Sequence, residues 1–217
     1  MAQEFSREAA VEQVVQRSRF IGCAVRLLHP PGELDDAPLA RVRQEFPGAS
    51  HYCWAYRWEA GQERAEDAGE PRGTAGLPIL SVLQREQLIH ALVVVVRYFG
   101  GVKLGRAGLF RAYHDAALAA AAAAHPEPLV PVTRVRLTCA YPAFDAVRRW
   151  LEDLYRATRL ERPSFIFGEA VHWTGLLPAG ALEAAAPLWE RWHGQVEWAV
   201  ESEELAVWPR ADAAPPS

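Results

Sequence analysis

The sequence predicts an α+β protein with two domains, and three observations indicate this. In the second half, stretches with alternating apolar residues and stretches with helical apolar spacing follow one another in the order βαββαβ. In the first half, strand-like and helix-like stretches are mixed. Three prolines within residues 125–131 separate the halves and predict a stiff linker, because proline fixes φ and lacks a backbone donor. The expected domains are residues 1–127 and 128–208, followed by a flexible tail, 209–217.

The first domain is expected to contain a central strand that is buried on both faces. Residues 89–98 have four consecutive valines at their centre, which is typical of such a strand. A glycine-rich loop follows this strand and opens a long helix near 107–124. The preceding residues predict, in order, strands near 9–15 and 19–28, a helix near 34–46, a strand over 50–58, and a short helix near 77–85 that follows a loop rich in Glu, Asp and Gly.

The second domain is expected to be a ferredoxin-like plait. Residues 132–141 alternate as in a strand, and residues 142–155 carry apolar side chains at helical spacing. Strands near 158–167 and 170–177 and a second helix over 180–193 follow, and Gly194 ends that helix at a favoured position. A last strand over 195–208 completes the βαββαβ order of the split-βαβ fold.

Composition limits the function classes. With 217 residues, of which 50% are hydrophobic and 23% charged, the chain can bury a core and is not intrinsically disordered. No apolar run reaches the roughly 18 residues of a membrane helix, and no secretion signal is visible, so a cytoplasmic protein is expected. The odd set of cysteines (Cys23, Cys53 and Cys139) predicts free thiols. A net charge of −4 means that nucleic-acid binding must depend on a local basic patch.

The segment 95–113 is the strongest candidate for a binding site. It runs from a buried strand through several glycines into a helix, and a helix start attracts anions. Residues 87–114 contain four cations and no carboxylate, and Lys103 is the single lysine among 23 basic residues. The phosphate-loop and dinucleotide glycine patterns are absent. The alternative interpretation is a tight turn in which the glycines serve backbone geometry alone.

A second loop, 66–78, combines carboxylates with a basic residue. Glu66, Asp67 and Glu70 beside Arg72 could hold a metal ion or pair with the cations of the glycine loop. A solvated acidic loop is the favoured interpretation, because no histidine stands at ligand spacing, and no metal is predicted. Thr74 is a candidate cap for the following helix.

The strand 51–58 offers two further possibilities. Its alternation places Tyr52, Trp54, Tyr56 and Trp58 on one face, where they could stack on bases, although a core role is favoured. His51 and Cys53 on the opposite face resemble half of a nucleophile–base pair. No third group that would orient them is evident, so no catalytic residue is predicted.

Four segments, residues 18–20, 51–57, 67–76 and 95–113, closely resemble the YigZ/Impact family, and the resemblance covers residues 1 to about 124. It implies that the N-terminal domain is a two-layer α/β sandwich similar to domain 2 of ribosomal protein S5. The second half is similar to a domain of translation elongation factor G. Ala68 stands where the family usually has a second aspartate, which further disfavours a metal role.

The resemblance implies a role in translation regulation, with RNA, the ribosome or a translation-related protein as partner and with no established enzymatic activity or cofactor. The first hypothesis is therefore a binding module that takes RNA or another phosphate-containing ligand, with Arg134 and Arg136 extending a basic track over the second domain. The second is an enzyme acting on a small phosphorylated substrate, with His51, Glu70 or His114 as acid or base. The third is a protein-interaction module. The expected anion site comprises Arg72, Gly73, Thr74, Arg97, Gly100, Gly101, Lys103, Gly105, Arg106, Gly108 and Arg111.

Overall fold

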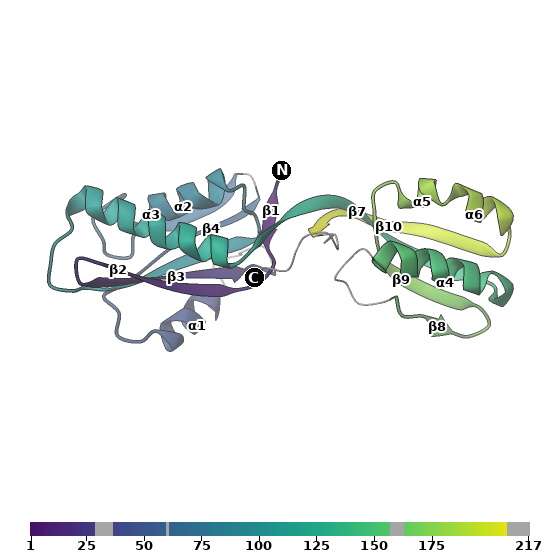
Figure 1. The fold of residues 1–217 in the computed structure, drawn as a ribbon, viewed down its shortest axis with the longest axis horizontal. Helices are drawn as coiled ribbons and strands as arrows, with labels where there is room; N and C mark the ends of the chain where they lie inside the picture. Colours follow the sequence, from purple (N-terminus) through teal and green to yellow (C-terminus); the bar gives the residue numbers. More distant parts are fainter. Residues whose placement is uncertain (29–36, 60, 157–162, 208–217) are drawn as a thin grey trace. The chain divides into compact units, whose positions relative to one another are not determined.

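The computed structural model describes residues 1–28, 37–59, 61–156 and 163–207 (Figure 1). The chain divides into two compact units, Met1–Pro128 and Leu129–Ser217. Both units combine helices with antiparallel sheet, which confirms the α+β class. Among the helices within the described ranges, none is both long and apolar enough to cross a membrane.

The N-terminal unit is built on a five-stranded antiparallel sheet. Its strand order is β2-β3-β6-β4-β5, so β6 is the central strand. A short strand, β1 (Gln3–Phe5), pairs with the first residues of β7. The sheet strands are β2 (Ala9–Val15), β3 (Ser18–Arg26), β4 (His51–Glu59), β5 (Gln62–Glu66) and β6 (Ala91–Tyr98).

Helices cover both faces of this sheet. The helices α2 (Gly76–Arg85) and α3 (Gly105–Ala123) lie on one face, and α1 (Ala37–Glu45) lies on the other (Figure 1). The alanine-rich sequence of α3 lets this helix approach β3 closely. At Gly22 a Cβ atom would be only 2.2 Å from the Ala116 carbonyl oxygen, so this position requires glycine.

The aromatic row of β4 belongs to the core on the α1 face. Trp54 is buried with Val94 and Val96 of β6, and Tyr52 packs against the same cluster. The Tyr52 hydroxyl donates a hydrogen bond of 2.6 Å to the Phe46 carbonyl. The favoured interpretation as core is therefore confirmed for Tyr52, Trp54 and Tyr56, whereas Trp58 is not part of this cluster and has its ring centre 4.3 Å from that of His90. The resemblance implies a two-layer sandwich, with helices on one face of the sheet. The helix α1 covers the opposite face and so adds a third layer.

The C-terminal unit has the strand order β10-β7-β9-β8, with every pair antiparallel. This is the ferredoxin-like order, as the sequence predicts. Its core joins β7 and β9 to α4 through residues such as Leu137, Leu151 and Trp173. The elements are β7 (Pro126–Cys139), α4 (Tyr141–Arg156), β8 (Ile166–Phe167), β9 (Val171–Pro178), α5 (Ala181–Ala184), α6 (Ala186–Arg191) and β10 (Val196–Val207).

The structure differs from the sequence predictions at several elements. The expected linker 125–131 is largely strand, since β7 begins at Pro126. The expected single helix 180–193 is two helices, because Pro187 favours the first turn of a new helix and lacks a donor for a continuing one. The short strands β1 and β5 are not predicted. Parts of the predicted elements 34–46 and 158–167, and the predicted tail, lie outside the described residues.

Candidate functional site

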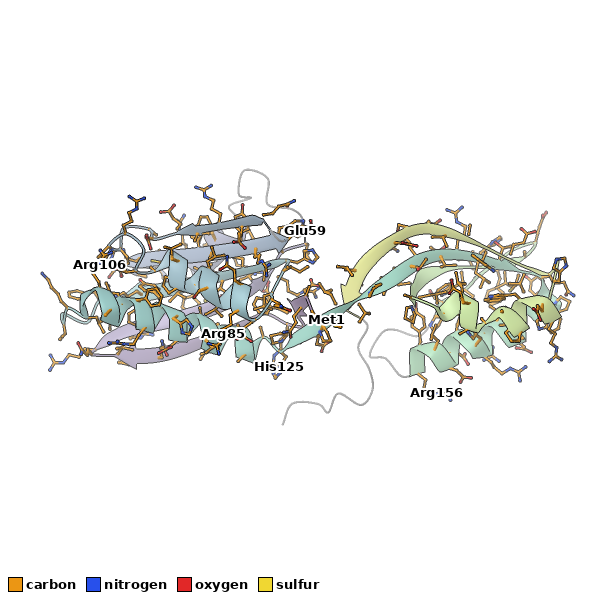
Figure 2. All side chains as sticks on the ribbon, turned by 90° about the horizontal axis from the view of Figure 1, so that it is seen from above. Met1, Glu59, Arg85, Arg106, His125 and Arg156 are labelled. Carbon is orange, nitrogen blue, oxygen red and sulfur yellow. The ribbon has the colours of Figure 1, made fainter. Side chains whose placement is uncertain are left out.

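The glycine-rich loop joins β6 to α3 at one end of the N-terminal unit, where Figure 2 places Arg106. The Phe99 N–H donates to Ser50 Oγ at 3.2 Å, and the Gly100 N–H donates to Ser18 Oγ at 3.1 Å. A Cβ atom at Gly100 would meet the Arg17 carbonyl at 2.1 Å. The loop is therefore anchored to the ends of β3 and β4, and its path requires this glycine.

The remaining glycines of the loop serve backbone conformation or close packing. Gly101 (φ +83°) and Gly105 (φ +69°) adopt the left-handed region that favours glycine. A Cβ atom at Gly108 would be 3.1 Å from Leu104 Cβ. Backbone geometry thus accounts for these positions, as the tight-turn interpretation expects. An anion-binding role for the same loop is compatible with it.

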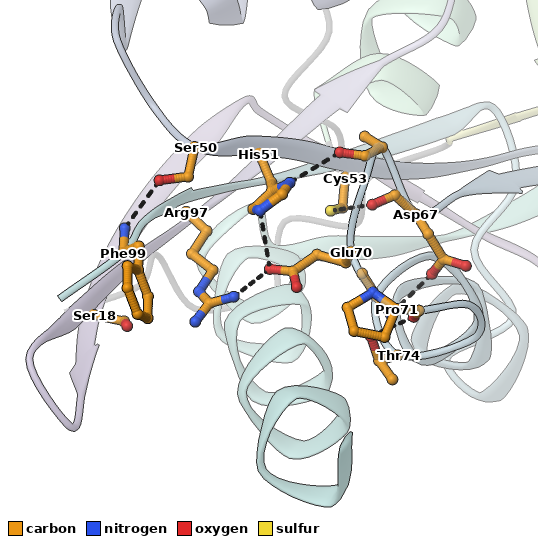
Figure 3. A network of polar contacts seen from close by, with 12 residues as sticks. Ser18, Ser50, His51, Cys53, Asp67, Glu70, Pro71, Thr74, Arg97 and Phe99 are labelled. Carbon is orange, nitrogen blue, oxygen red and sulfur yellow. Dashed lines mark hydrogen bonds and ion pairs between the residues drawn. The ribbon is translucent and has the colours of Figure 1, made fainter. Parts of the chain in front are cut away.

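Arg97 is not a free cation of the predicted anion site. It is only 5% exposed, and its guanidinium forms an ion pair with the Glu70 carboxylate (Figure 3). Arg97 lies on the central strand β6 between Phe20 of β3 and His51 of β4 in register. Neighbouring strands and the loop 67–75 enclose the Arg97 side chain. The Glu70 carboxylate neutralises its positive charge inside the protein.

Glu70 collects polar groups from three parts of the unit. Besides Arg97, it accepts a hydrogen bond of 2.9 Å from the Tyr113 hydroxyl of α3, and His51 Nε2 lies 3.9 Å from the same carboxylate oxygen. Burial is the first cause that raises the pKa of Tyr113, and the neighbouring Cys53 and Glu70 raise it further. The hydroxyl therefore stays protonated and donates to Glu70.

Cys53 and His51 are engaged by the backbone of the same loop. Cys53 Sγ donates to the Asp67 carbonyl at 3.0 Å, and burial raises the pKa of this thiol to about 12. His51 Nδ1 lies 3.0 Å from the Ala68 carbonyl oxygen, so Nδ1 carries the hydrogen. A protonated, buried thiol is a poor nucleophile.

The Asp67 side chain closes the loop and caps the N-terminus of α2. The sequence pattern predicts Thr74 for this capping role. Its carboxylate accepts backbone N–H hydrogen bonds from Gly73 (2.7 Å), Gly76 (2.8 Å) and Ala75 (3.0 Å). Thr74 instead donates to the Pro71 carbonyl at 2.6 Å and does not cap the helix. Within the described residues, no group of three or more His, Cys, Asp and Glu side chains is placed to hold a metal ion.

The pKa of Asp67 reflects two opposing causes. Partial burial acts to raise it, but the N–H groups of Gly73, Gly76 and Ala75 and the charge of Arg106 together outweigh burial. The pKa therefore lies below its usual 3.8. The carboxylate stays ionised and bound to the backbone at neutral pH.

Four predicted cations remain exposed around the start of α3. None of them forms an ion pair with a carboxylate in the described part of the chain. Arg106 also donates a hydrogen bond of 2.7 Å to the Arg72 carbonyl, which joins the loop 67–75 to α3. No side chain caps the N-terminus of α3, and no acidic residue lies in its first turn. These cations are Arg72, Lys103, Arg106 and Arg111.

The other residues that the sequence suggests for binding do not extend the surface formed by these four cations. His114 is half-buried on α3, and its Nδ1 lies 3.1 Å from the Asp115 carboxylate. Arg136 of the C-terminal unit forms an ion pair with Glu201 of β10, which neutralises the expected basic track there. Arg134 is half-buried and also has an interaction partner.

Sequence reasoning missed the structural roles of Asp67 and Tyr113 and the exposure of Phe99 and Phe110. The cap by Asp67 reaches six to nine residues along the chain, beyond the local capping patterns. The pairing of Tyr113 with Glu70 spans two distant segments. Only the two phenylalanines carry a local signal, because both stand among glycines and cations in 95–113.

Comparisons with known proteins agree with this architecture. The Impact N-terminal domain model matches residues 16–121. An "IMPACT family member" of Haemophilus influenzae is 39% identical over 160 residues, covering 70% of this chain and 76% of the relative. An "IMPACT family member in pol 5'region" of Thermus thermophilus is 36% identical over 167 residues, covering 77% and 88%.

Two further likenesses are weaker in identity or coverage. The "IMPACT family member YigZ" of Escherichia coli is 38% identical over 138 residues, covering 60% of this chain and 65% of that protein. A solved structure described as "Crystal structure of an hypothetical protein" has a TM-score of 0.57 and 28% identity over 93% of this chain and 97% of that one. The identity and coverage of the relatives show that this chain belongs to the IMPACT family.

Proposed function

We propose that this chain is a translation-associated binding protein of the cytoplasm that takes an RNA, free or within the ribosome, on the N-terminal unit. The ligand's phosphates bind the surface formed by Arg72, Lys103, Arg106 and Arg111 at the start of α3, called here the basic surface. One observation carries the proposal. These side chains are exposed and form no ion pair with a carboxylate in the described residues, although the chain as a whole has a net charge of −4.

The nearby carboxylates form no ion pair with these cations, although Asp67 and Arg106 attract each other through their charges. Glu70 is buried and already neutralises Arg97, while Asp67 is turned onto three backbone N–H groups. An ion pair that is complete in the interior leaves the surface cations to interact with solvent ions or a ligand. Phosphate contacts of Lys and Arg with nucleic acid supply much of such binding and release condensed counterions.

The N-terminus of α3 also favours the binding of an anion. The first N–H groups of a helix have no partner within the helix, and they form the positive end of its dipole. At α3 this end lies among Lys103, Arg106 and Arg111 and has no side-chain cap. A phosphate placed there would meet backbone donors and cationic side chains together.

The enzymatic alternative is less well supported by the geometry. Its acid–base groups would be His51, Glu70 or His114, and Glu70 is buried between Arg97 and Tyr113. A carboxylate in that position is committed to its two donors. The protein-interaction alternative is favoured if the experiment below finds that loss of these cations leaves RNA binding unchanged.

Binding of a labelled RNA and of ribosomal subunits, measured by fluorescence anisotropy at several salt concentrations, tests the proposal. The Lys103→Ala/Arg106→Ala variant is expected to bind more weakly, with a salt slope shallower by about 0.7–0.9 for each phosphate that it no longer neutralises. The control is Arg43→Ala/Arg85→Ala, which removes the same charge from α1 and from the end of α2. If the first variant keeps the wild-type affinity and salt slope, the proposal is wrong.

A further inference from the structure

Two exposed phenylalanines belong to the same segment of the chain as three of the four cations of the basic surface. Phe99, in the loop before α3, is 50% exposed, and Phe110, in the second turn of α3, is 44% exposed. Large apolar side chains at the surface are informative when they gather beside a binding feature. Between 99 and 111 the chain carries, in this order, Phe99, Lys103, Arg106, Phe110 and Arg111.

The ring of Phe99 lies beside the buried ion pair. The Arg97 guanidinium carbon lies 5.4 Å from the centre of the Phe99 ring, and Arg97 is itself held by Glu70 (Figure 3). The Phe99 N–H is bonded to Ser50, and the next N–H is bonded to Ser18. Half of the phenylalanine remains accessible although its backbone and one neighbour are fixed. A side chain held in this way loses little conformational entropy on binding a flat group.

Phe110 is placed by the helix. It follows Arg106 by four residues, so both side chains project from the same face of α3, and Arg111 is its direct neighbour. Arg106 contacts the Arg72 carbonyl, which brings this face beside the loop 67–75. The second aromatic side chain therefore lies on the same face of α3 as Arg106.

We propose that the basic surface takes single-stranded RNA, with Phe99 and Phe110 stacking on unpaired bases while Lys103, Arg106 and Arg111 contact the backbone. The inference rests on the proposed RNA binding and specifies the form of the RNA. Aromatic side chains interleaved with cations are typical of single-strand recognition, because every base offers a flat face. In a duplex the base faces are covered by their neighbours, and phosphate contacts alone would leave the two rings without a role.

Charge favours this occupant over a protein partner. The cores of protein–protein interfaces are depleted in charged residues and in lysine, although arginine and aromatic residues are enriched there, so it is charge without an ion pair that disfavours a protein partner. The basic surface presents Lys103 and three arginines that form no ion pair in the described residues. A polyanion with flat apolar groups complements both properties at once.

The test compares an unstructured oligouridylate with a hairpin duplex of equal charge by fluorescence anisotropy. The Phe99→Leu/Phe110→Leu variant should bind the single strand about tenfold more weakly, with the salt slope unchanged, because stacking is removed while the charge is kept. Phe99→Tyr keeps the ring and should retain affinity. Phe167→Leu, at a phenylalanine of the C-terminal unit that is 59% exposed, is the matched control and should have no effect.

The outcomes separate this inference from the proposed function. If the cation variant weakens RNA binding but the two leucine substitutions do not, the RNA contacts only the cations and the stacking inference is wrong. Equal affinity for hairpin and single strand would also overturn it. If the cation variant binds RNA as wild type does, the proposed function fails as well. Thermal melting of each variant identifies a loss of folding, and Phe110→Leu alone, on the helix surface, gives an independent measurement.

Discussion

Arg97 and Glu70 form a buried ion pair that joins the central strand β6 to the loop between β5 and α2 (Figure 3). The Tyr113 hydroxyl donates to the same carboxylate, so α3 is joined to it too. Arg97 in turn lies beside the rings of Phe20 and Phe99. One carboxylate thus fixes the segments that carry the exposed cations, although both members of the pair are buried.

Removal of the Glu70 carboxylate is expected to destabilise the protein strongly. In Glu70→Ala the buried Arg97 charge and the Tyr113 hydroxyl both lose their partner. Breaking a buried pair from one side typically costs about 3–5 kcal/mol of unfolding free energy. Urea denaturation measures this loss, with Glu66→Ala as the exposed control. A cost below about 1 kcal/mol would contradict the buried pair.

The two glycines at 100 and 101 should respond differently to alanine. A Cβ atom at Gly100 would lie 2.1 Å from main-chain atoms of Arg17, which cannot rotate away. Gly100→Ala is therefore expected to cost about 3 kcal/mol or more. Gly101 has φ +83° and open space around it, so Gly101→Ala should cost only about 1–2 kcal/mol. Equal costs in chemical denaturation would mean that the loop does not pack against β3 as described.

Asp67 should link stability to acid pH. Its pKa is lower in the folded protein than its usual 3.8, so the carboxylate stabilises the fold above that value and the contribution is lost as pH falls through the folded pKa. Asp67→Asn is expected to cost about 1–3 kcal/mol at pH 7, because the amide keeps only one acceptor oxygen and sets its NH2 group against a backbone N–H that the second carboxylate oxygen had bound.

Urea denaturation of both proteins from pH 7 to pH 2 checks this linkage. The difference in unfolding free energy between wild type and Asp67→Asn should be constant near neutrality and shrink below about pH 3.8. Glu66→Gln, at the exposed neighbouring position, serves as control. A difference that does not change with pH would show that the Asp67 carboxylate is not held as an anion.

The architecture is largely readable from local patterns. The valines of β6 are buried on both faces, and the βαββαβ order of the second half produces the ferredoxin-like sheet. The misses have local causes. The strand β5 has the sequence QERAE and lies at a sheet edge, so it carries no apolar signal. Prolines at the start of β7 indicate a linker, although pairing with β1 and β10 makes them part of a strand.

The site is readable only in part. The cations and glycines of 95–113 stand out because they lie in one short segment. Lys103 lies in a loop and Arg106 and Arg111 lie on the surface of a helix, so their exposure is expected from the sequence. The burial of Arg97 depends on Glu70, which lies 27 residues away and arrives by folding of a loop. The sequence leaves open a pairing between the carboxylates of 66–70 and the cations of the glycine loop, but it does not tell which cation is paired, since Arg97 and Arg106 look alike in sequence.

The thiols offer a chemical test of the interior around Glu70. Burial raises the pKa of Cys53 and of Cys23 to about 12, and burial also raises the pKa of Cys139. Because the thiolate is the reactive form, none of the three is expected to react with Ellman's reagent at pH 7.5 in the folded protein. In guanidinium chloride all three should react.

A variant with Cys23→Ser and Cys139→Ser isolates Cys53 as the remaining thiol. Its expected behaviour is the same: protection in the folded state and release on unfolding, because Cys53 Sγ is enclosed and donates to the Asp67 carbonyl. Rapid stoichiometric labelling of the folded variant would show an accessible thiolate. That result would return Cys53 and His51 to consideration as a nucleophile–base pair, because a reactive thiolate beside an imidazole is what such catalysis requires.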